Sequence, residues 1–191
     1  IYPGYKFKIV DAMITNFQHI PEELKQYKQW VLVGTEGELI DPHNGRRASV
    51  IDPSTWSDYE YAKSVCGIGL GFVITANDPY CLIDIDNKIT NPATPDQLAR
   101  QEKVLIAFNS WTERSRSGRG YHIIIKGSIP RGIDQDHIGV YSTGRYMIMT
   151  GDVVRDAPIT DYNDLVNQLY NEATKTSHRA ELVDGMATMS D

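Results

Sequence analysis

The apolar run 80–87, which ends in two aspartates, constrains this chain more than any other segment. Its apolar residues favour a strand, and strand side chains alternate in direction, so Asp84 and Asp86 are expected on the same face. Their Cα atoms would lie about 6.5–7 Å apart, which lets both carboxylates reach one ion. Aspartate is disfavoured within strands, and hard cations such as Mg²⁺ or Mn²⁺ prefer carboxylate oxygens. The pattern predicts a divalent-metal site, and the alternative is a strand end with two solvated acids.

A second polar segment, 111–122, leads into the β-branched run 123–126. Its glycines permit tight backbone geometry and the close approach of a ligand. Guanidinium and backbone amide groups suit phosphate oxygens, and His122 at the junction can donate to a phosphate or assist proton transfer. The segment predicts a phosphate-binding loop, and the alternative is a solvated basic hairpin. The candidate contacts are Ser115, Arg116, Ser117, Gly118, Arg119 and His122.

The charge, the cysteine content and the apolar stretches of the chain argue against several classes of protein. The chain carries 19 Lys and Arg against 25 Asp and Glu, a formal charge of −6. This balance argues against a protein coated in positive charge for nonspecific duplex binding. Two cysteines provide neither a disulfide framework nor a zinc-ligand spacing. No apolar stretch reaches the roughly 18 residues of a membrane helix, and no signal peptide is evident, so we expect a cytoplasmic protein without a membrane partner.

The rest of the chain reads as alternating helices and strands. Helices are expected over 20–27, 58–65, 94–110 and 161–173, and strands over 29–34, 67–75, 80–86, 121–126, 138–141 and 145–150. Ser57 is the expected cap of the second helix, and Thr94 with Pro95 begins the third. The strands 67–75 and 80–86 are expected to pair as a hairpin. The order predicts an α+β fold with a mostly antiparallel sheet backed by helices.

Three other segments complete the pattern. The glycine-rich strand 67–75 is not a dinucleotide loop, because no helix follows it. Its glycines are instead expected to let another element pack closely. Residues 132–136 form a polar connection, and 174–191 a polar tail or linker.

Several motifs in order along residues 20–152 together resemble the primase-polymerase (prim-pol) branch of the archaeo-eukaryotic primase superfamily, found in phages and plasmids. They are 28–32, 44–45, 48–49, 52–56, 67–73, 84–86, 112–122 and 145–151. The resemblance implies an RRM-like catalytic core of the archaeo-eukaryotic primase type. The catalytic domain would span 20–155, between an N-terminal extension (1–19) and a C-terminal helix with a polar tail (156–191).

The resemblance also implies a function: a DNA primase and polymerase that carries out metal-dependent, template-directed nucleotidyl transfer in phage or plasmid replication. It assigns Asp84 and Asp86 to Mg²⁺ or Mn²⁺ and makes them catalytic together with His122. Ser115, Ser117 and His122 would contact the incoming triphosphate, and Arg145 is a further candidate. Two metal ions can activate a 3′-hydroxyl and stabilise pyrophosphate, while the protein positions groups and neutralises charge. The implied partners are nucleoside triphosphates, a DNA template and primer, and a helicase domain in the full-length protein.

Two positions depart from the family pattern. Family members carry a third acid in the strand before the Arg-Tyr segment, where this chain has Gly139, and Ser142 replaces a further acid. Asp134, Asp136 or Glu113 are the acids that could substitute. Two other functions stay open: a replication module that binds nucleotide or single-stranded DNA without catalysis, and a metal-dependent glycosyltransferase, since those enzymes also use an apolar-Asp-x-Asp strand.

Overall fold

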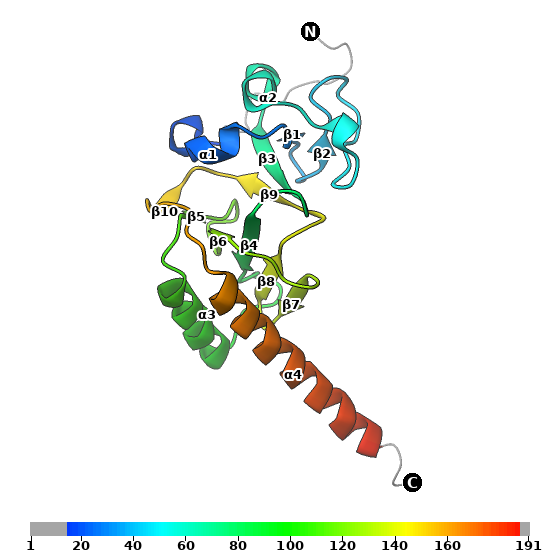
Figure 1. Cartoon of the computed structure of the whole chain (residues 1–191), viewed down its shortest axis with the longest axis vertical. Helices are drawn as coiled ribbons and strands as arrows, with labels where there is room; N and C mark the ends of the chain where they lie inside the picture. Colours follow the sequence, from blue (N-terminus) through cyan, green and yellow to red (C-terminus); the bar gives the residue numbers. More distant parts are fainter. Residues whose placement is uncertain (1–14, 188–191) are drawn as a thin grey trace. The chain divides into compact units, whose positions relative to one another are not determined.

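The computed structural model describes residues 15–187 and divides the chain into two compact units. Among the described residues, unit 1 contains 15–73 and Tyr146–Asp152, and unit 2 contains Ile74–Arg145 and the chain from Val153 onward. Within residues 15–187, two sheets and four α-helices give an α+β fold, which confirms the predicted class. Figure 1 labels the elements. The predicted boundaries of a catalytic domain at 20 and 155 stay a prediction.

Unit 1 is built on a four-stranded sheet in the order β2-β1-β3-β9. Trp30 of β1 makes edge contacts with Tyr59 and Phe72, with ring centroids 5.0 and 5.1 Å apart. Gly71 lies directly opposite Val31, where an added Cβ would come 3.2 Å from a Val31 methyl, so a glycine in this strand permits close packing as predicted. The elements are η1 (Phe17–His19), α1 (Glu22–Lys25), β1 (Trp30–Val33), β2 (Leu39–Ile40), η2 (Pro53–Thr55), α2 (Tyr59–Val65), β3 (Gly69–Ile74) and β9 (Arg145–Met149).

Unit 2 is built on a six-stranded sheet in the order β10-β5-β6-β4-β8-β7, and its pairs run antiparallel. The aspartate strand β4 lies near the middle, between β6 and β8. The elements are β4 (Tyr80–Ile85), α3 (Pro95–Ala107), β5 (Thr112–Arg114), β6 (Tyr121–Lys126), β7 (Ile133–Gln135), β8 (Ile138–Tyr141), β10 (Val153–Arg155) and α4 (Asn163–Ala187).

The apolar core of unit 2 lies on one face of this sheet. Ile83 and Ile85 of β4 pack there with Val104 of α3 and Val166 of α4, and all four are buried. Complete burial of such a side chain contributes about 1.5–3 kcal/mol each. Because side chains alternate along a strand, Asp84 lies on the opposite face from both isoleucines.

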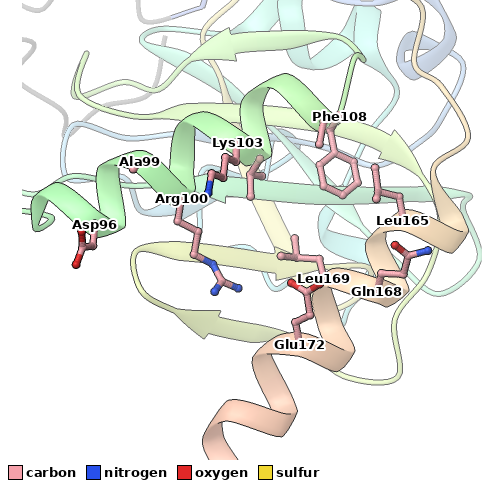
Figure 2. Close-up of a pocket in the computed structure, with 11 residues that line it drawn as sticks. Asp96, Ala99, Arg100, Lys103, Phe108, Leu165, Gln168, Leu169 and Glu172 are labelled. Atoms are coloured by element: carbon pink, nitrogen blue, oxygen red, sulfur yellow. The ribbon is translucent and has the colours of Figure 1, made fainter.

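Helix α3 is fixed at both ends. Thr94 and Gln97 form a reciprocal capping box, and Pro95 occupies the first turn, as the sequence predicts. At the other end, the guanidinium of Arg155 donates to the carbonyls of Leu105 and Phe108, each at 2.8 Å. A pocket of about 560 Å³ lies between α3 and α4. Figure 2 shows Arg100 extending from α3 toward Leu169 and Glu172 of α4.

The structure corrects the predicted pattern at several elements. Strands β3 and β4 do not form a hairpin, because β3 belongs to the sheet of unit 1 and β4 to that of unit 2. Residues 112–114, expected within a loop, form β5, and the expected connection 132–136 contains β7. Asp58 caps α2 in place of Ser57, since its carboxylate accepts from the Tyr61 N–H at 2.9 Å.

The C-terminal prediction also changes. Residues 174–187, expected as a tail, continue helix α4, which runs from Asn163 to Ala187. Residues 188–191 of the predicted tail, and 1–14 of the predicted extension, lie outside the described residues. Among residues 15–187, none of the helices has the length and hydropathy that crossing a membrane requires.

Candidate active site

A row of residues crosses the sheet of unit 2 from strand to strand. Asp84 of β4 lies opposite His122 of β6 and opposite Gly139 of β8. His122 is in turn opposite Glu113 of β5, and Gly139 opposite Asp134 of β7. Directly opposed residues share one face of an antiparallel sheet. The row therefore lies on the face away from the apolar core.

His122 is held between two acids. Its Nδ1 lies 2.8 Å from Oε1 of Glu113, whose side chain is fully buried, and its Nε2 lies 3.8 Å from Oδ1 of Asp84. Burial of the imidazole would lower its pKa, but the hydrogen bond to Glu113 and the charges of Glu113, Asp84 and Asp86 outweigh burial and raise the pKa of His122. The site thus brings His122 beside Asp84, and the catalytic role of the two residues stays a prediction.

Asp84 and Asp86 face a common space. The Asp84 side chain is 29% exposed, and burial raises its pKa although the nearby His122 opposes that shift. Asp86 follows the last residue of β4, and its backbone N–H donates to the His137 carbonyl at 3.0 Å. The Asp86 carboxylate forms an ion pair with Lys88 at 3.2 Å.

These two aspartates line a cleft of about 570 Å³ in unit 2. Asp134 and Asp136 line it too, so acids outnumber the cations in its wall. The cations of the wall are Lys88 and Arg145. Arg145, a predicted nucleotide contact, is steadied by its guanidinium stacking 4.4 Å from the centroid of the Tyr141 ring.

The predicted phosphate loop is the turn that joins β5 to β6. Its backbone closes through two hydrogen bonds, from the Ser115 N–H to the Gly120 carbonyl at 2.9 Å and from the Gly118 N–H to the Ser115 carbonyl at 2.8 Å. The hydroxyls of Ser115 and Ser117 lie 3.2 Å apart. Gly118 has a φ of +72°, a conformation that suits glycine.

The turn is joined to the end of β4 at two points. Arg119 Nε donates to the Asn87 carbonyl at 3.0 Å. Gly120 approaches β4 so closely that an added Cβ would lie 2.1 Å from the Ile85 carbonyl oxygen. The turn therefore neighbours the aspartates, but Ser115, Arg116, Ser117, Gly118 and Arg119 do not line the cleft, whereas Arg145 does.

Tyr141 occupies the space beside the missing third acid. A Cβ at Gly139 would lie 2.6 Å from Cε2 of the Tyr141 ring, and the Tyr141 hydroxyl donates to Oδ2 of Asp134 at 3.4 Å. Of the possible substitutes, Glu113 is paired with His122, while Asp134 and Asp136 line the cleft. Across residues 15–187, no three His, Cys, Asp or Glu side chains are grouped so that they could hold a metal ion.

The sequence did not reveal several supporting residues. The buried Gln101 of α3 donates from Nε2 to the Asp86 carbonyl at 2.8 Å and to the His137 carbonyl at 3.3 Å, which anchors the cleft to the helix. Gln97 donates to Asp136 at 3.2 Å. A polar residue on the inner face of a predicted helix is the only signal that Gln101 leaves in the sequence.

Sequence comparisons relate the chain to known proteins. No protein-family model matches the chain. A DNA primase-polymerase of Nitratiruptor phage NrS-1 is 37% identical over 147 residues, a match that covers 68% of this chain and 20% of that protein. An S-adenosylmethionine:tRNA ribosyltransferase-isomerase of Acetivibrio thermocellus is 48% identical over 44 residues, 23% of this chain and 12% of that enzyme.

The two similarities differ in how much of the chain they cover. The second is confined to a short segment, whereas the first covers more than half of the chain. The chain spans only about a fifth of the phage protein's length. On the strength of the long similarity, together with Asp84 and Asp86 at one cleft and His122 beside Asp84, the chain belongs to the phage-type primase-polymerase domains.

Proposed function

We propose that this domain carries out metal-dependent, template-directed nucleotidyl transfer, as a DNA primase and polymerase domain of phage replication. The observation that carries the proposal is the pairing of Asp84 with His122, next to a cleft that Asp84, Asp86 and Arg145 line. The similarity to a phage DNA primase-polymerase supports the same activity. The substrates would be nucleoside triphosphates and a primed or unprimed DNA template.

The donor set of the cleft fits Mg²⁺ or Mn²⁺. Mg²⁺ is commonly held by one or two carboxylates, with substrate phosphates and water as the remaining ligands, so a third protein carboxylate is not essential for binding. Asp84 and Asp86 would hold the ion, which when bound activates the 3′-hydroxyl and neutralises charge on the phosphates. The Lys88 ammonium pairs with one oxygen of the Asp86 carboxylate, Oδ2, and would compete with an ion for that oxygen.

The chain's own cations and donors would handle the triphosphate. His122 presents Nε2 next to Asp84, where it can donate to a phosphate oxygen. Arg145 supplies a fixed positive charge in the wall of the cleft, because its guanidinium stacks on Tyr141. The turn 115–120 adds two serine hydroxyls beside the end of β4, and Arg116 and Arg119 add charge.

Primer extension tests the proposal. Purified protein is incubated with a primed DNA template, deoxynucleoside triphosphates and Mn²⁺ or Mg²⁺, and we expect incorporation that EDTA abolishes. Asp84→Asn and Asp86→Asn should each lower the rate by about 100-fold or more, since each removes a carboxylate whose ion is worth several kcal/mol in the transition state. Asp156→Asn, an exposed acid of unit 2 outside the cleft, is the control and should match wild type. Incorporation that survives Asp84→Asn together with Asp86→Asn would contradict the proposal.

Gly139 supports a second candidate, a module that binds nucleotide or single-stranded DNA without turnover. Its position in the row lacks a carboxylate, and the Tyr141 ring fills the space that a side chain there would need. Titration calorimetry with a deoxynucleoside triphosphate and Mg²⁺ separates the two functions. Heat of binding without incorporation on any template would support the module, and incorporation would exclude it.

A further inference from the structure

We infer that Glu113 is a positioning residue, which holds the His122 imidazole with its Nε2 directed toward Asp84. The inference rests on the proposed function, and it assigns a role to a buried acid that does not line the cleft. Glu113 is fully buried and lies on β5, opposite His122 of β6. His122 lies opposite Asp84 of β4, so the imidazole sits between a buried acid and a cleft acid.

The hydrogen bond to Glu113 determines which ring nitrogen faces the cleft. A carboxylate accepts hydrogen bonds, so the positioning role requires that Nδ1, 2.8 Å from the Glu113 oxygen, carry the proton shared by the two groups. The Nε2 atom then lies on the far side of the ring, 3.8 Å from Asp84. A half-turn of the ring would break the bond to Glu113 and aim a carbon at Asp84.

Burial of the Glu113 carboxylate costs free energy of desolvation. A carboxylate removed from water needs strong hydrogen bonds to offset its desolvation, and an apolar side chain would fill the same space more cheaply. The side chain of His122 is 11% exposed, so the small accessible part of the ring is what a substrate could meet. The acid therefore acts on chemistry through His122 rather than by direct contact.

The variants Glu113→Gln and Glu113→Leu separate positioning from mere packing. Glutamine keeps the size and an accepting oxygen, whereas leucine keeps similar bulk and removes the acceptor. We expect Glu113→Gln to stay within about threefold of wild type in kcat/KM for incorporation. Glu113→Leu should fall by about tenfold or more, the loss seen when the partner that orients a site residue is removed. Glu102→Leu, on the exposed side of α3, is the matched control and should leave kcat/KM unchanged.

A double-mutant cycle with His122→Ala tests whether Glu113 acts through His122. If it does, Glu113→Leu changes kcat/KM less than twofold once the imidazole is absent. Equal losses in the presence and absence of His122, or a Glu113→Leu protein as active as wild type, would overturn the inference. So would a Glu113→Gln protein as impaired as Glu113→Leu.

A spectroscopic readout keeps this inference separate from the activity itself. Nitrogen-15 NMR of the labelled imidazole should show protonated Nδ1 in wild type and Glu113→Gln, and a changed tautomer mixture in Glu113→Leu. Circular dichroism establishes that each variant is folded. A wild-type protein that incorporates no nucleotide would refute the proposed function, whereas an unchanged NMR spectrum in folded Glu113→Leu would refute the positioning role.

Discussion

Gly120→Ala tests how tightly the turn 115–120 is pressed against the aspartate strand. In the structure an added Cβ would lie 2.1 Å from the Ile85 carbonyl oxygen and 3.2 Å from the Ile85 carbonyl carbon. Real Cβ contacts essentially never fall below 3.0 Å, so the two backbones must separate by at least 0.9 Å. Neither can yield by a simple rotamer change, because the obstacle is backbone of the central strand. Overpacking usually costs about 1–3 kcal/mol, and the rigid surroundings place this change near about 3 kcal/mol.

Gly118→Ala supplies the matched control, since it lies in the same turn but has open space around its Cβ position. Its φ of +72° costs alanine about 1–2 kcal/mol, partly offset by about 0.4–1 kcal/mol from the stiffer unfolded chain. For a chain of this size 1 kcal/mol shifts Tm by about 2–4 °C. Thermal unfolding followed by circular dichroism should therefore show Gly120→Ala melting about 6–12 °C below wild type and clearly below Gly118→Ala. Equal melting temperatures for the two variants would refute the argument from close approach.

Two further substitutions test the site, and a labelling experiment tests the burial of the two thiols. Asp84→Asn should raise Tm at neutral pH in the absence of ligand, because burial raises the pKa of Asp84 and wild type loses stability as pH rises through that raised pKa. The higher Tm of the variant should disappear below about pH 3.9, where the Asp84 carboxyl is protonated in both the folded and the unfolded protein. A lower Tm for the variant at pH 7 would contradict this prediction. Gln101→Ala should lower the free energy of unfolding in urea by about 1–3 kcal/mol, because two carbonyls of the cleft lose their buried donor, while Glu102→Ala on the exposed neighbouring position should change it little. Burial raises the pKa of Cys81 to about 12 and that of Cys66 to about 11, so both thiols should alkylate slowly with iodoacetamide at pH 8 in native protein and rapidly in urea; rapid native labelling of Cys81 would contradict its burial.

Local signals predicted local structure well. Strand β6 occupies the expected 121–126, and Thr94 begins α3 through a capping box. The expected hairpin of 67–75 and 80–86 implies a turn between them, and a turn is present, since the Asp78 carboxylate accepts from the Thr75 and Tyr80 N–H groups at 2.8 and 2.9 Å. The strands on either side nevertheless enter different sheets. A turn determines the direction of the chain, but the partner of a strand depends on distant residues that no local pattern contains.

The candidate site was predictable in its residues and less so in its arrangement. Asp84, Asp86 and Arg145 line one cleft and His122 adjoins Asp84, whereas the serine turn joins β4 from the side. The pairing of Glu113 with His122 follows from symmetry about the turn 115–120, which places them at equal distances from its ends. Recognising β5 as a strand would have exposed it. The failure at 174–187 has another cause: the polar residues 174–179 interrupt the apolar pattern that indicates the helix before them.

Strand β4 also links folding and chemistry in a way that limits how the chain can vary. Its odd-numbered residues Ile83 and Ile85 build the interior, and the even-numbered Asp84 between them belongs to the cleft. A shift of one residue in the pairing with β6 would bury the carboxylate among isoleucines and turn the isoleucines to the cleft. A shift in strand register would thus be unfavourable for two reasons, the buried carboxylate and the exposed isoleucines. The requirement for an apolar interior therefore also fixes the position of Asp84.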